Sequence, residues 1–261
     1  MLAADYAYTN AGFLALAHRG GGQWEPNRGV ENTMAAFARA VALGYRYIET
    51  DLQATRDGDL VCFHDPTLER LTGQPGRMAD LTSAEVAQLR VGGEPIAFFA
   101  GVTEAFPEVN FNADLKTEQA IEPLVRLIAD QRLADRILVD SFSQYRLSRF
   151  RALTRGRVPT AMAPPGVAWT VFVPFISRVI ASPAVAVQVP VTYPIGRATV
   201  PVVTAAVVAR VHAAGKVIHV WTIDDPAEME RLIDLGVDGI VTDRPDLLKA
   251  VLQRRGLWPT S

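Results

Sequence analysis

The regular alternation of strand-like and helix-like segments constrains the fold of this chain more than any other feature. Short apolar runs predict strands, and longer amphipathic runs between them predict helices. The expected strands cover residues 13–18, 45–52, 60–64, 109–115, 136–141, 158–162, 184–189, 216–221 and 238–242. The expected helices cover residues 34–43, 83–89, 119–130, 144–154, 203–214, 227–235 and 245–254. Strands that alternate with helices form a parallel sheet with right-handed crossovers.

Apart from the segment 60–64, eight expected strands alternate with seven expected helices in 261 residues, which favours a closed (β/α)8 barrel, that is, an α/β TIM barrel, over an open sheet, which is the alternative. The segment 60–64 follows a turn at 55–59, so we expect it to form a hairpin with the second strand rather than a ninth barrel strand. The chain contains no internal repeat, low-complexity tract or linker. We therefore expect a single domain over residues 1–261.

The composition excludes several classes of protein. Hydrophobic residues make up 49% of the chain and charged residues 21%, which permits a large core and excludes a disordered chain. The net charge of −2, with no aromatic residues interleaved in a basic groove, argues against a nucleic-acid partner. Cys62 is the one cysteine, so no internal disulfide can form. No basic segment precedes an apolar run at the N-terminus, and we expect a cytoplasmic protein.

Polar side chains end several of the expected strands. His18 and Arg19 close the first strand, and His64 closes the hairpin strand. Glu49 and Asp51 lie two residues apart in the second strand, so their side chains point to the same face. Active sites of (β/α)8 barrels are built at the carboxyl ends of the strands. These five residues are therefore candidates for a functional site.

Two later strands add further candidates. Asn110, Asn112, Asp114 and Lys116 share one face of the strand expected at 109–115, opposite an apolar face. Inside a barrel, such a polar face is directed at a ligand. Trp221 ends the penultimate expected strand.

These residue types suit a phosphate ester held beside a hard cation. Carboxylates such as Glu49, Asp51 and Asp114 are the ligands that Mg²⁺ or Ca²⁺ prefers. Arg19 and Lys116 can neutralise phosphate oxygens, while two imidazoles accept and donate protons. The sequence contains neither of the glycine-rich nucleotide-binding motifs Gly-x-x-x-x-Gly-Lys and Gly-x-Gly-x-x-Gly, so nucleotide binding is not indicated.

Each feature also has an ordinary structural interpretation. A histidine in a barrel is often structural, strand carboxylates can be solvated, and Trp221 can belong to the core. Asn32 and Thr33 precede an expected helix and are interpreted as its N-cap. His212 and His219 belong to no motif, and we expect both to be structural.

The order of the motifs resembles that of the glycerophosphodiester phosphodiesterase family. The motifs that carry the resemblance are His18-Arg19-Gly20, Glu31-Asn32-Thr33, Glu49-Thr50-Asp51, His64-Asp65-Pro66, Asp114-Leu115-Lys116, Ser141-Phe142, Trp221-Thr222 and Thr242-Asp243-Arg244-Pro245. The match runs from His18 to about Leu248, which is nearly the whole chain. Any one triplet is a weak signal, whereas the ordered set is specific.

The resemblance implies a fold, a reaction and a set of roles. It implies a small cap inserted over the barrel mouth after the hairpin, and hydrolysis of glycerophosphodiesters to an alcohol and glycerol 3-phosphate. It implies His18 and His64 as the acid–base pair. By the same resemblance, Glu49, Asp51 and Asp114 are ligands of one divalent cation, Mg²⁺ or Ca²⁺, and Arg19, Lys116 and Trp221 bind the substrate.

The sequence departs from the family pattern at three places. Asp114 stands where the family usually has Glu, and its shorter side chain puts direct contact with the ion in doubt. The stretch between Gly22 and Glu31 is longer than usual, and residues 97–99 read Ala-Phe-Phe in the cap region. The last two departures alter the pocket walls, so they bear on the identity of the substrate more than on the reaction.

An acid-free stretch leaves two alternatives open. Residues 141–223 contain no Asp or Glu but nine Arg or Lys, and within them Trp169, Phe172 and Phe175 share a face of the apolar segment 167–180. This segment could bind acyl chains and touch a membrane surface, as in a lysophospholipase D-type hydrolase of lysolipids, or it could pack against the barrel or an oligomer partner. A non-catalytic barrel that only binds a phosphoester is a further alternative, against which the intact histidine pair argues.

Overall fold

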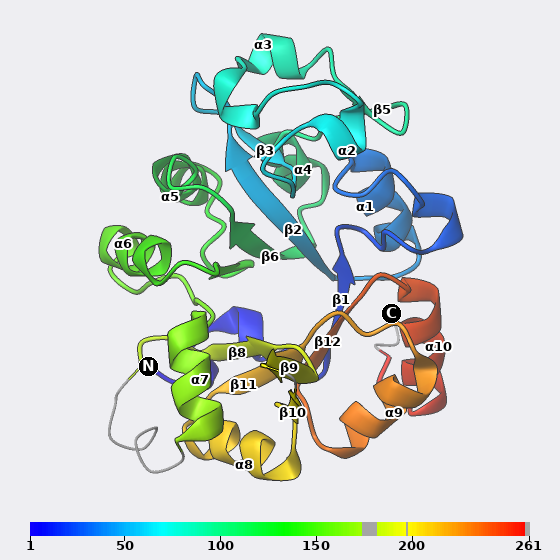
Figure 1. Cartoon of the computed structure of the whole chain (residues 1–261), viewed down its shortest axis with the longest axis vertical. Coiled ribbons are helices and arrows are strands. Elements are labelled where there is room, and N and C mark those ends of the chain that lie inside the picture. The colour runs from blue at the N-terminus through cyan, green and yellow to red at the C-terminus, as the bar shows by residue number, and fades with distance from the viewer. Residues whose placement is uncertain (174–181, 197, 259–261) are drawn as a thin grey trace.

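The central sheet is parallel and curls around an axis (Figure 1). The computed structural model describes residues 1–173, 182–196 and 198–258. Seven strands pair in the order β7-β6-β2-β1-β12-β11-β8, and every neighbouring pair in this series is parallel. Their bounds are β1 Leu14–His18, β2 Tyr47–Ala54, β6 Asn110–Leu115, β7 Ile137–Asp140, β8 Ala186–Val189, β11 Val217–Val220 and β12 Gly239–Thr242.

A short eighth strand position closes the sheet into a barrel. Thr160 forms a parallel bridge with Val139 of β7, and Ala161 forms one with Ala186 of β8. The strand predicted over residues 158–162 is reduced to these two bridges, because Pro159 has no N–H to donate to a ladder of hydrogen bonds. The predicted (β/α)8 barrel is confirmed.

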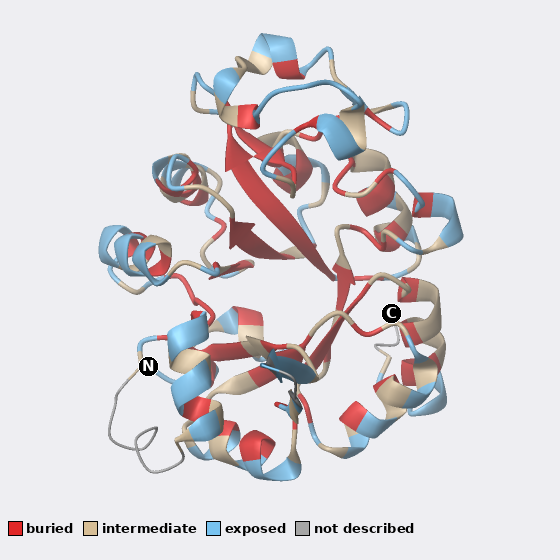
Figure 2. Ribbon diagram, in the orientation of Figure 1, coloured by how far each residue is buried: buried red, intermediate tan, exposed pale blue. Residues whose placement is uncertain are grey.

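Helices cover the outside of the barrel, with their buried sides toward the strands (Figure 2). The longer helices are α1 Met34–Ala42, α4 Phe99–Ala105, α5 Ile121–Asp130, α6 Gln144–Thr154, α7 Pro164–Phe172, α8 Ala205–Ala213, α9 Pro226–Asp234 and α10 Pro245–Arg254. Six of the seven predicted helices begin and end within two residues of these bounds. Across residues 1–173, 182–196 and 198–258, none of the helices combines the length and apolarity needed to traverse a bilayer.

The cap after the second strand is also confirmed. It begins with β3 (Leu60–Cys62), which pairs antiparallel with β2 as the hairpin prediction required. Its short elements are α2 Glu69–Thr72, α3 Ser83–Val86, β4 Arg90–Val91, β5 Glu94–Pro95 and the 3₁₀ turn η4 Met78–Asp80. A separate small core holds it together, formed by Val61, Phe63, Leu68, Met78, Val86, Val91 and Ile96. In Figure 1 the cap lies at the top, over the end of β2.

Two predictions in the cap region were wrong or incomplete. The helix expected at 83–89 ends at Val86, because the next residues enter the β4–β5 hairpin. Helix α4 was not predicted at all, since seven residues give too little of a helical repeat to read.

The region around the acid-free stretch also differs from expectation. Helix α7 begins at Pro164, before the apolar segment 167–180, and residues 174–180 of that segment lie outside the described residues. The hairpin of β9 (Thr192–Ile195) and β10 (Ala198–Pro201) was missed, because a proline inside a short run obscures a strand pattern.

Strand parity decides which side chains enter the barrel. Toward the amino ends of the strands the interior is apolar, with Leu14, Leu16, Tyr47, Leu138, Ala186 and Val241 packed together. Further along, Glu49 lies in register with His18 and Asn112, and Asp51 lies in register with Asp114. The interior of the barrel is therefore polar at the carboxyl ends of the strands, and apolar side chains fill it toward their amino ends. The 3₁₀ turns η1 Ala3–Asp5, η2 Ala7–Thr9 and η3 Glu25–Asn27 complete the elements.

Candidate active site

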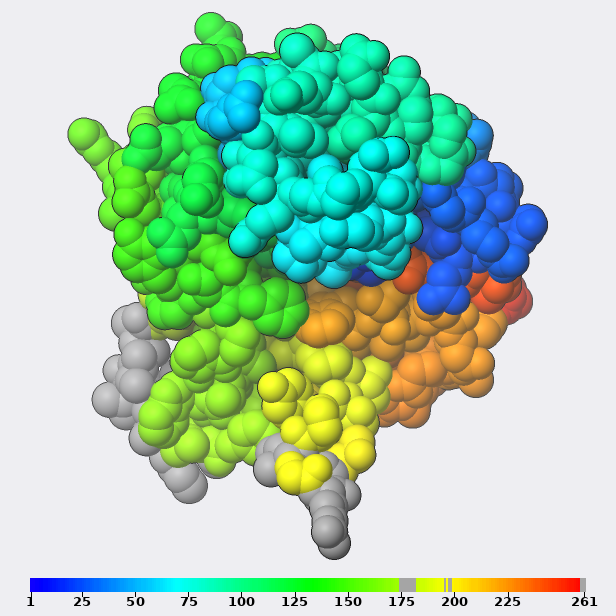
Figure 3. All heavy atoms as spheres, turned by 45° about the horizontal axis from the view of Figure 1, so that its top comes forward, coloured from blue at the N-terminus to red at the C-terminus, as the bar shows by residue number. Residues whose placement is uncertain are grey.

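A polar cavity of about 160 Å³ opens at the carboxyl ends of the strands. Eight of its lining residues are those to which the motif resemblance gives a catalytic, substrate-binding or metal-binding role: His18, Arg19, Glu49, Asp51, His64, Asp114, Lys116 and Trp221. The remaining lining residues are Asn112, Asp140, Phe142, Gln188, Thr222 and Val241. Figure 3 shows the cap and the β9–β10 hairpin on either side of a hollow on one face of the molecule. The structure thus brings these eight residues and the further candidate Asn112 to a single cavity, whereas the candidate Asn110, at the amino end of β6, does not line it.

His18 is held at the end of β1 by a carboxylate from the far end of the chain. Its Nδ1 lies 2.8 Å from Asp243 Oδ1, and its Nε2 lies 3.7 Å from Glu49 Oε2. Burial alone would lower the pKa of His18, but Glu49 and Asp243 outweigh burial and shift the pKa upward. The turn after β1 requires glycine, because Gly21 has a φ of +97° and a Cβ there would lie 2.6 Å from the ring of Pro245.

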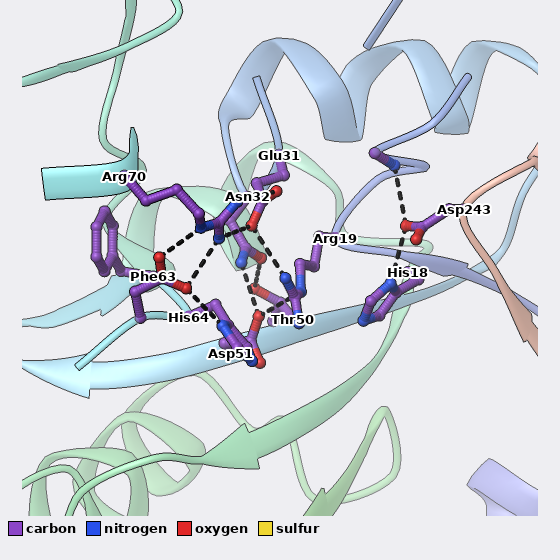
Figure 4. A network of polar contacts seen from close by, with 12 residues as sticks. His18, Arg19, Glu31, Asn32, Thr50, Asp51, Phe63, His64, Arg70 and Asp243 are labelled. Carbon is purple, nitrogen blue, oxygen red and sulfur yellow. Dashed lines mark hydrogen bonds and ion pairs between the residues drawn. The ribbon is translucent and has the colours of Figure 1, made fainter. Parts of the chain in front are cut away.

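His64 is oriented by the cap. Its Nδ1 lies 2.7 Å from Asp65 Oδ1, and Arg70 binds Asp65 through Nε at 2.5 Å and Nη2 at 2.9 Å. Arg70 also bonds both carboxylate oxygens of Glu31 (Figure 4). The hydrogen bonds from Arg70 are the main reason that the pKa of Asp65 falls to about 2. Arg70 belongs to no sequence motif, and only the fold shows that it positions this histidine.

Asp51 is the centre of the polar network. Its Oδ1 lies 2.9 Å from Lys116 Nζ, and its Oδ2 lies 2.9 Å from Arg19 Nε. Burial would raise the pKa of Asp51, but the charges of Lys116 and Arg19 outweigh burial and hold the pKa below its usual range. Arg19 and Lys116, expected to hold phosphate, therefore pair with carboxylates in this structure.

Asn32 belongs to this network rather than to a helix cap. Its Nδ2 donates to Asp51 Oδ2 at 2.8 Å, and its Oδ1 accepts from Thr50 Oγ1 at 2.8 Å. The N-cap of α1 is Thr33 alone, whose Oγ1 accepts from the N–H of Ala36 at 3.2 Å. The capping interpretation is thus correct for Thr33 and wrong for Asn32, whose side chain instead fixes the orientation of Asp51.

Three carboxyl groups in the cavity have too little positive charge close to them for all three to be ionised together. Burial, reinforced by Asp51, raises the pKa of Glu49 to about 7. Lys116 Nζ lies 2.6 Å from Asp114 Oδ2, but Asp114 Oδ1 is buried and has no partner within the described part of the chain. Asp140, in register with Asp114 on β7, also has a buried oxygen without a partner there, and burial raises its pKa well above the usual range. A further cation would allow these groups to ionise together.

Asp140 is a residue that the sequence analysis missed. The resemblance singled out the following Ser141-Phe142, and nothing in the sequence placed Asp140 beside Asp114. That placement depends on the register between β6 and β7, which pairs these two residues directly.

The carboxylate oxygens of the cavity suit a divalent cation, although in this structure they do not lie close enough together to bind one. Carboxylate oxygens are what Mg²⁺ and Ca²⁺ prefer, and Asp114 Oδ1 is an unused buried oxygen on the cavity wall. Among the residues described, however, no three His, Cys, Asp or Glu side chains lie close enough to hold an ion as they stand. The ion pairs explain this, since Lys116 bridges Asp51 and Asp114. An ion held by both Asp51 and Asp114 would take the place of Lys116 Nζ between these carboxylates.

An amide and a histidine support the cavity from inside the barrel. Gln188 Nε2 donates to Asn112 Oδ1 at 2.9 Å and lies 3.1 Å from Nδ1 of His219. Because the amide nitrogen is a donor, Nδ1 of His219 accepts and its proton resides on Nε2. His219 is fully buried, and burial lowers its pKa to about 4.

The pKa of His219 predicts an acid sensitivity of the fold. Between about pH 6.5 and pH 4 the unfolded chain binds a proton at this residue that the folded chain does not. The free energy of unfolding should therefore fall with falling pH, by about 1.4 kcal/mol per pH unit from this residue alone. Urea denaturation at several pH values measures the slope, which His219→Gln should reduce while His212→Gln, at an exposed surface histidine, should not. Equal slopes in the wild type and His219→Gln would contradict the assignment.

The barrel and the cavity at its carboxyl ends define a (β/α)8-barrel enzyme. The chain matches the family model "Glycerophosphoryl diester phosphodiesterase family" over residues 18–247. It is 39% identical over 251 residues to the Mycobacterium tuberculosis protein "Probable glycerophosphodiester phosphodiesterase 2", an alignment that covers 95% of this chain and 94% of that protein. It is 29% identical to the glycerophosphodiester phosphodiesterase of Caldanaerobacter subterraneus, with 93% and 99% of the two chains covered.

A solved structure shows the same fold. The Oleispira antarctica phosphodiesterase, in complex with the product sn-glycerol-3-phosphate, superposes with a TM-score of 0.77 at 22% identity, covering 95% of this chain and 99% of that one. The chain therefore belongs to the glycerophosphoryl diester phosphodiesterase family, as the order of its motifs predicted.

Proposed function

We propose that this chain hydrolyses glycerophosphodiesters to an alcohol and sn-glycerol 3-phosphate. The observation that carries the proposal is the single cavity lined by two histidines, His18 and His64, and two cations, Arg19 and Lys116. The names of the M. tuberculosis and C. subterraneus relatives support the reaction, and the product in the O. antarctica structure supports the kind of molecule bound.

His18 and His64 supply the proton transfers in this proposal. One imidazole takes the proton of the attacking oxygen, and the other gives a proton to the leaving alcohol. Each ring is oriented through Nδ1 by its own carboxylate, Asp243 or Asp65, which leaves Nε2 for the reacting groups. A barrel that only binds a phosphoester would have no need of two histidines oriented in this way.

The carboxylates and the positively charged side chains of the cavity have separate roles in this proposal. Glu49, Asp51 and Asp114 would hold one Mg²⁺ or Ca²⁺, which supplies positive charge against the phosphate oxygens. Lys116 and Arg19, once released from these carboxylates, bind the phosphate oxygens themselves. A phosphodiester would thus draw the two side chains out of the ion pairs that this structure shows.

Product analysis tests the proposal. The chain, supplied with glycerophosphocholine and Mg²⁺ or Ca²⁺, should release choline and sn-glycerol 3-phosphate in equal amounts. Phosphorus NMR separates this outcome from cleavage on the glycerol side, which would yield phosphocholine. The double variant His18→Ala/His64→Ala serves as the blank. Formation of phosphocholine, or an intact diester under every metal condition, would overturn the proposal.

A further inference from the structure

Two neutral amide side chains, Asn112 and Gln188, line the catalytic cavity, and no step of the proposed hydrolysis uses them. Asn112 lies on β6 two residues before Asp114, so the two side chains share one face of the strand. Gln188 lies on β8, and its Nε2 donates to Asn112 Oδ1 at 2.9 Å. The amide pair therefore belongs to the floor of the cavity, which is the part nearer the amino ends of the strands.

The amide of Gln188 is held from two sides. Besides Asn112 Oδ1, its Nε2 lies 3.1 Å from Nδ1 of His219, which is in register with Gln188 on β11. His219 is neutral because burial lowers its pKa to about 4, so its Nδ1 accepts a hydrogen bond from the amide. Both hydrogens on Gln188 Nε2 are thus used inside the protein. The carbonyl oxygen Oε1 is the group that Gln188 has left to offer a ligand.

Asn112 offers the complementary group. Its Oδ1 accepts from Gln188, which leaves its Nδ2 as a donor. Within residues 1–173, 182–196 and 198–258, neither Gln188 Oε1 nor Asn112 Nδ2 has a hydrogen-bond partner, and neither is among the unpartnered polar atoms that are fully buried. Both atoms are therefore open to a molecule that occupies the space above the floor. A hydroxyl group donates one hydrogen bond and accepts others, so it can pair with the acceptor and the donor together.

The position of the amide pair indicates which part of the substrate carries this hydroxyl. In the proposed function the phosphate binds at Lys116, whose Nζ contacts Asp114 in this structure. Two residues along a strand span about 7 Å, a distance that one glycerol unit attached to this phosphate can bridge. A quaternary ammonium or apolar group placed there would donate no hydrogen bond to Gln188 Oε1. Because polar groups left unpaired in a complex cost free energy, the floor suits the glycerol moiety.

We propose that Gln188 and Asn112 bind a hydroxyl of the glycerol moiety, and that His219 is a positioning residue that fixes the amide of Gln188. The inference rests on the proposed function and names the groups by which the cavity distinguishes a glycerol phosphate from other phosphate esters. A ligand without this hydroxyl leaves the donor and the acceptor unpaired beside it. Its binding should therefore be weaker by about 10–10²-fold.

Deoxy analogues of the product test the proposal without turnover. Calorimetry in the presence of Ca²⁺ compares sn-glycerol 3-phosphate with the two analogues that each lack one hydroxyl. The wild type should bind at least one of the two about 10–10²-fold more weakly than sn-glycerol 3-phosphate. Gln188→Met keeps the length of the side chain but removes its hydrogen-bonding groups, and should bring these affinities to within about twofold of each other. Gln253→Met, at an exposed glutamine on α10, should keep the wild-type ratio.

Two further variants keep the test independent of how well Gln188→Met folds. Gln188→Glu retains an oxygen acceptor but adds a negative charge, so all the phosphates should bind more weakly while the preference for the hydroxyl persists. His219→Leu removes the acceptor for Gln188 Nε2, and the preference should fall although His219 touches no substrate. A merely structural defect would weaken the binding of all the phosphates alike and would leave their ratio unchanged.

The outcomes separate this inference from the proposed function. Equal affinities of the wild type for sn-glycerol 3-phosphate and both analogues, or a preference that Gln188→Met leaves unchanged, overturns the inference even if glycerophosphocholine is hydrolysed. A preference that depends on Gln188, in a chain that hydrolyses no diester, supports the inference and overturns the proposed function. A wild type that binds none of these phosphates also overturns the inference.

Discussion

Replacing His18 or His64 with alanine should lower kcat for glycerophosphocholine by about 10²–10⁴-fold, the usual contribution of a positioned proton donor or acceptor. The loss should appear mainly in kcat, because Arg19 and Lys116 remain available for the phosphate. Steady-state kinetics at a fixed Mg²⁺ or Ca²⁺ concentration measures it. Circular dichroism establishes that each variant is folded.

The chain offers a matched control for this pair of substitutions. His212 lies on α8 with its Nε2 2.8 Å from Asp238, so it too is a histidine paired with a carboxylate, but it lies outside the cavity. His212→Ala should keep wild-type turnover. Near-normal turnover in His18→Ala or in His64→Ala would remove that residue from the acid–base pair.

Chelation of divalent ions should abolish turnover, and added Mg²⁺ or Ca²⁺ should restore it. A cation that acts on phosphate oxygens stabilises the transition state by several kcal/mol. Its removal should therefore lower the turnover rate by at least about 10²-fold. We expect this dependence on a divalent ion because the pKa values of Glu49, Asp114 and Asp140 are raised when no further cation is present. A bound cation would stabilise the charged forms of these carboxyl groups. Activity is measured after dialysis against a chelator and after each ion is returned.

Ion affinity gives a readout that does not depend on turnover. Calorimetric titration with Ca²⁺ should show that Asp114→Asn weakens binding by roughly 10–100-fold or more, a loss that even residues around metal ligands produce. Asp140→Asn should weaken binding as well, because Asp140 lies in register with Asp114. Glu108→Gln, an exposed carboxylate at the opposite end of β6, is the matched control. Full activity in the chelated protein, or equal affinities in all these proteins, would contradict the metal assignment.

The sequence predicted those parts of the molecule that depend on local patterns. Strand and helix periodicity gave the barrel, and the period of two along β2 correctly placed Glu49 and Asp51 on one face toward the interior. Ordered motifs placed His18 and His64 at strand ends that the barrel brings together. These are features that neighbours in the chain encode directly.

The features that were missed depend on contacts between distant segments. Asp243 meets His18 across 225 positions, and Arg70 reaches Glu31 across 39. Such pairings are set by how β1, β12 and the cap pack, and periodicity carries no information about them. The same holds for Asp140, whose role is visible only from the β6–β7 register. An apolar groove beside the cavity, with residues of α7 and β9 in its walls, likewise requires these two elements to lie together, and neither was predicted with its observed bounds.

Crystallography with Ca²⁺ and sn-glycerol 3-phosphate tests the central arrangement most directly. We expect one ion about 2.3–2.6 Å from carboxylate oxygens of Glu49 and Asp51, with Lys116 turned from Asp51 to the phosphate. The phosphate should lie within reach of both His18 and His64. An ion bound elsewhere on the protein, or a phosphate outside this cavity while Lys116 still bridges Asp51 and Asp114, would contradict the account.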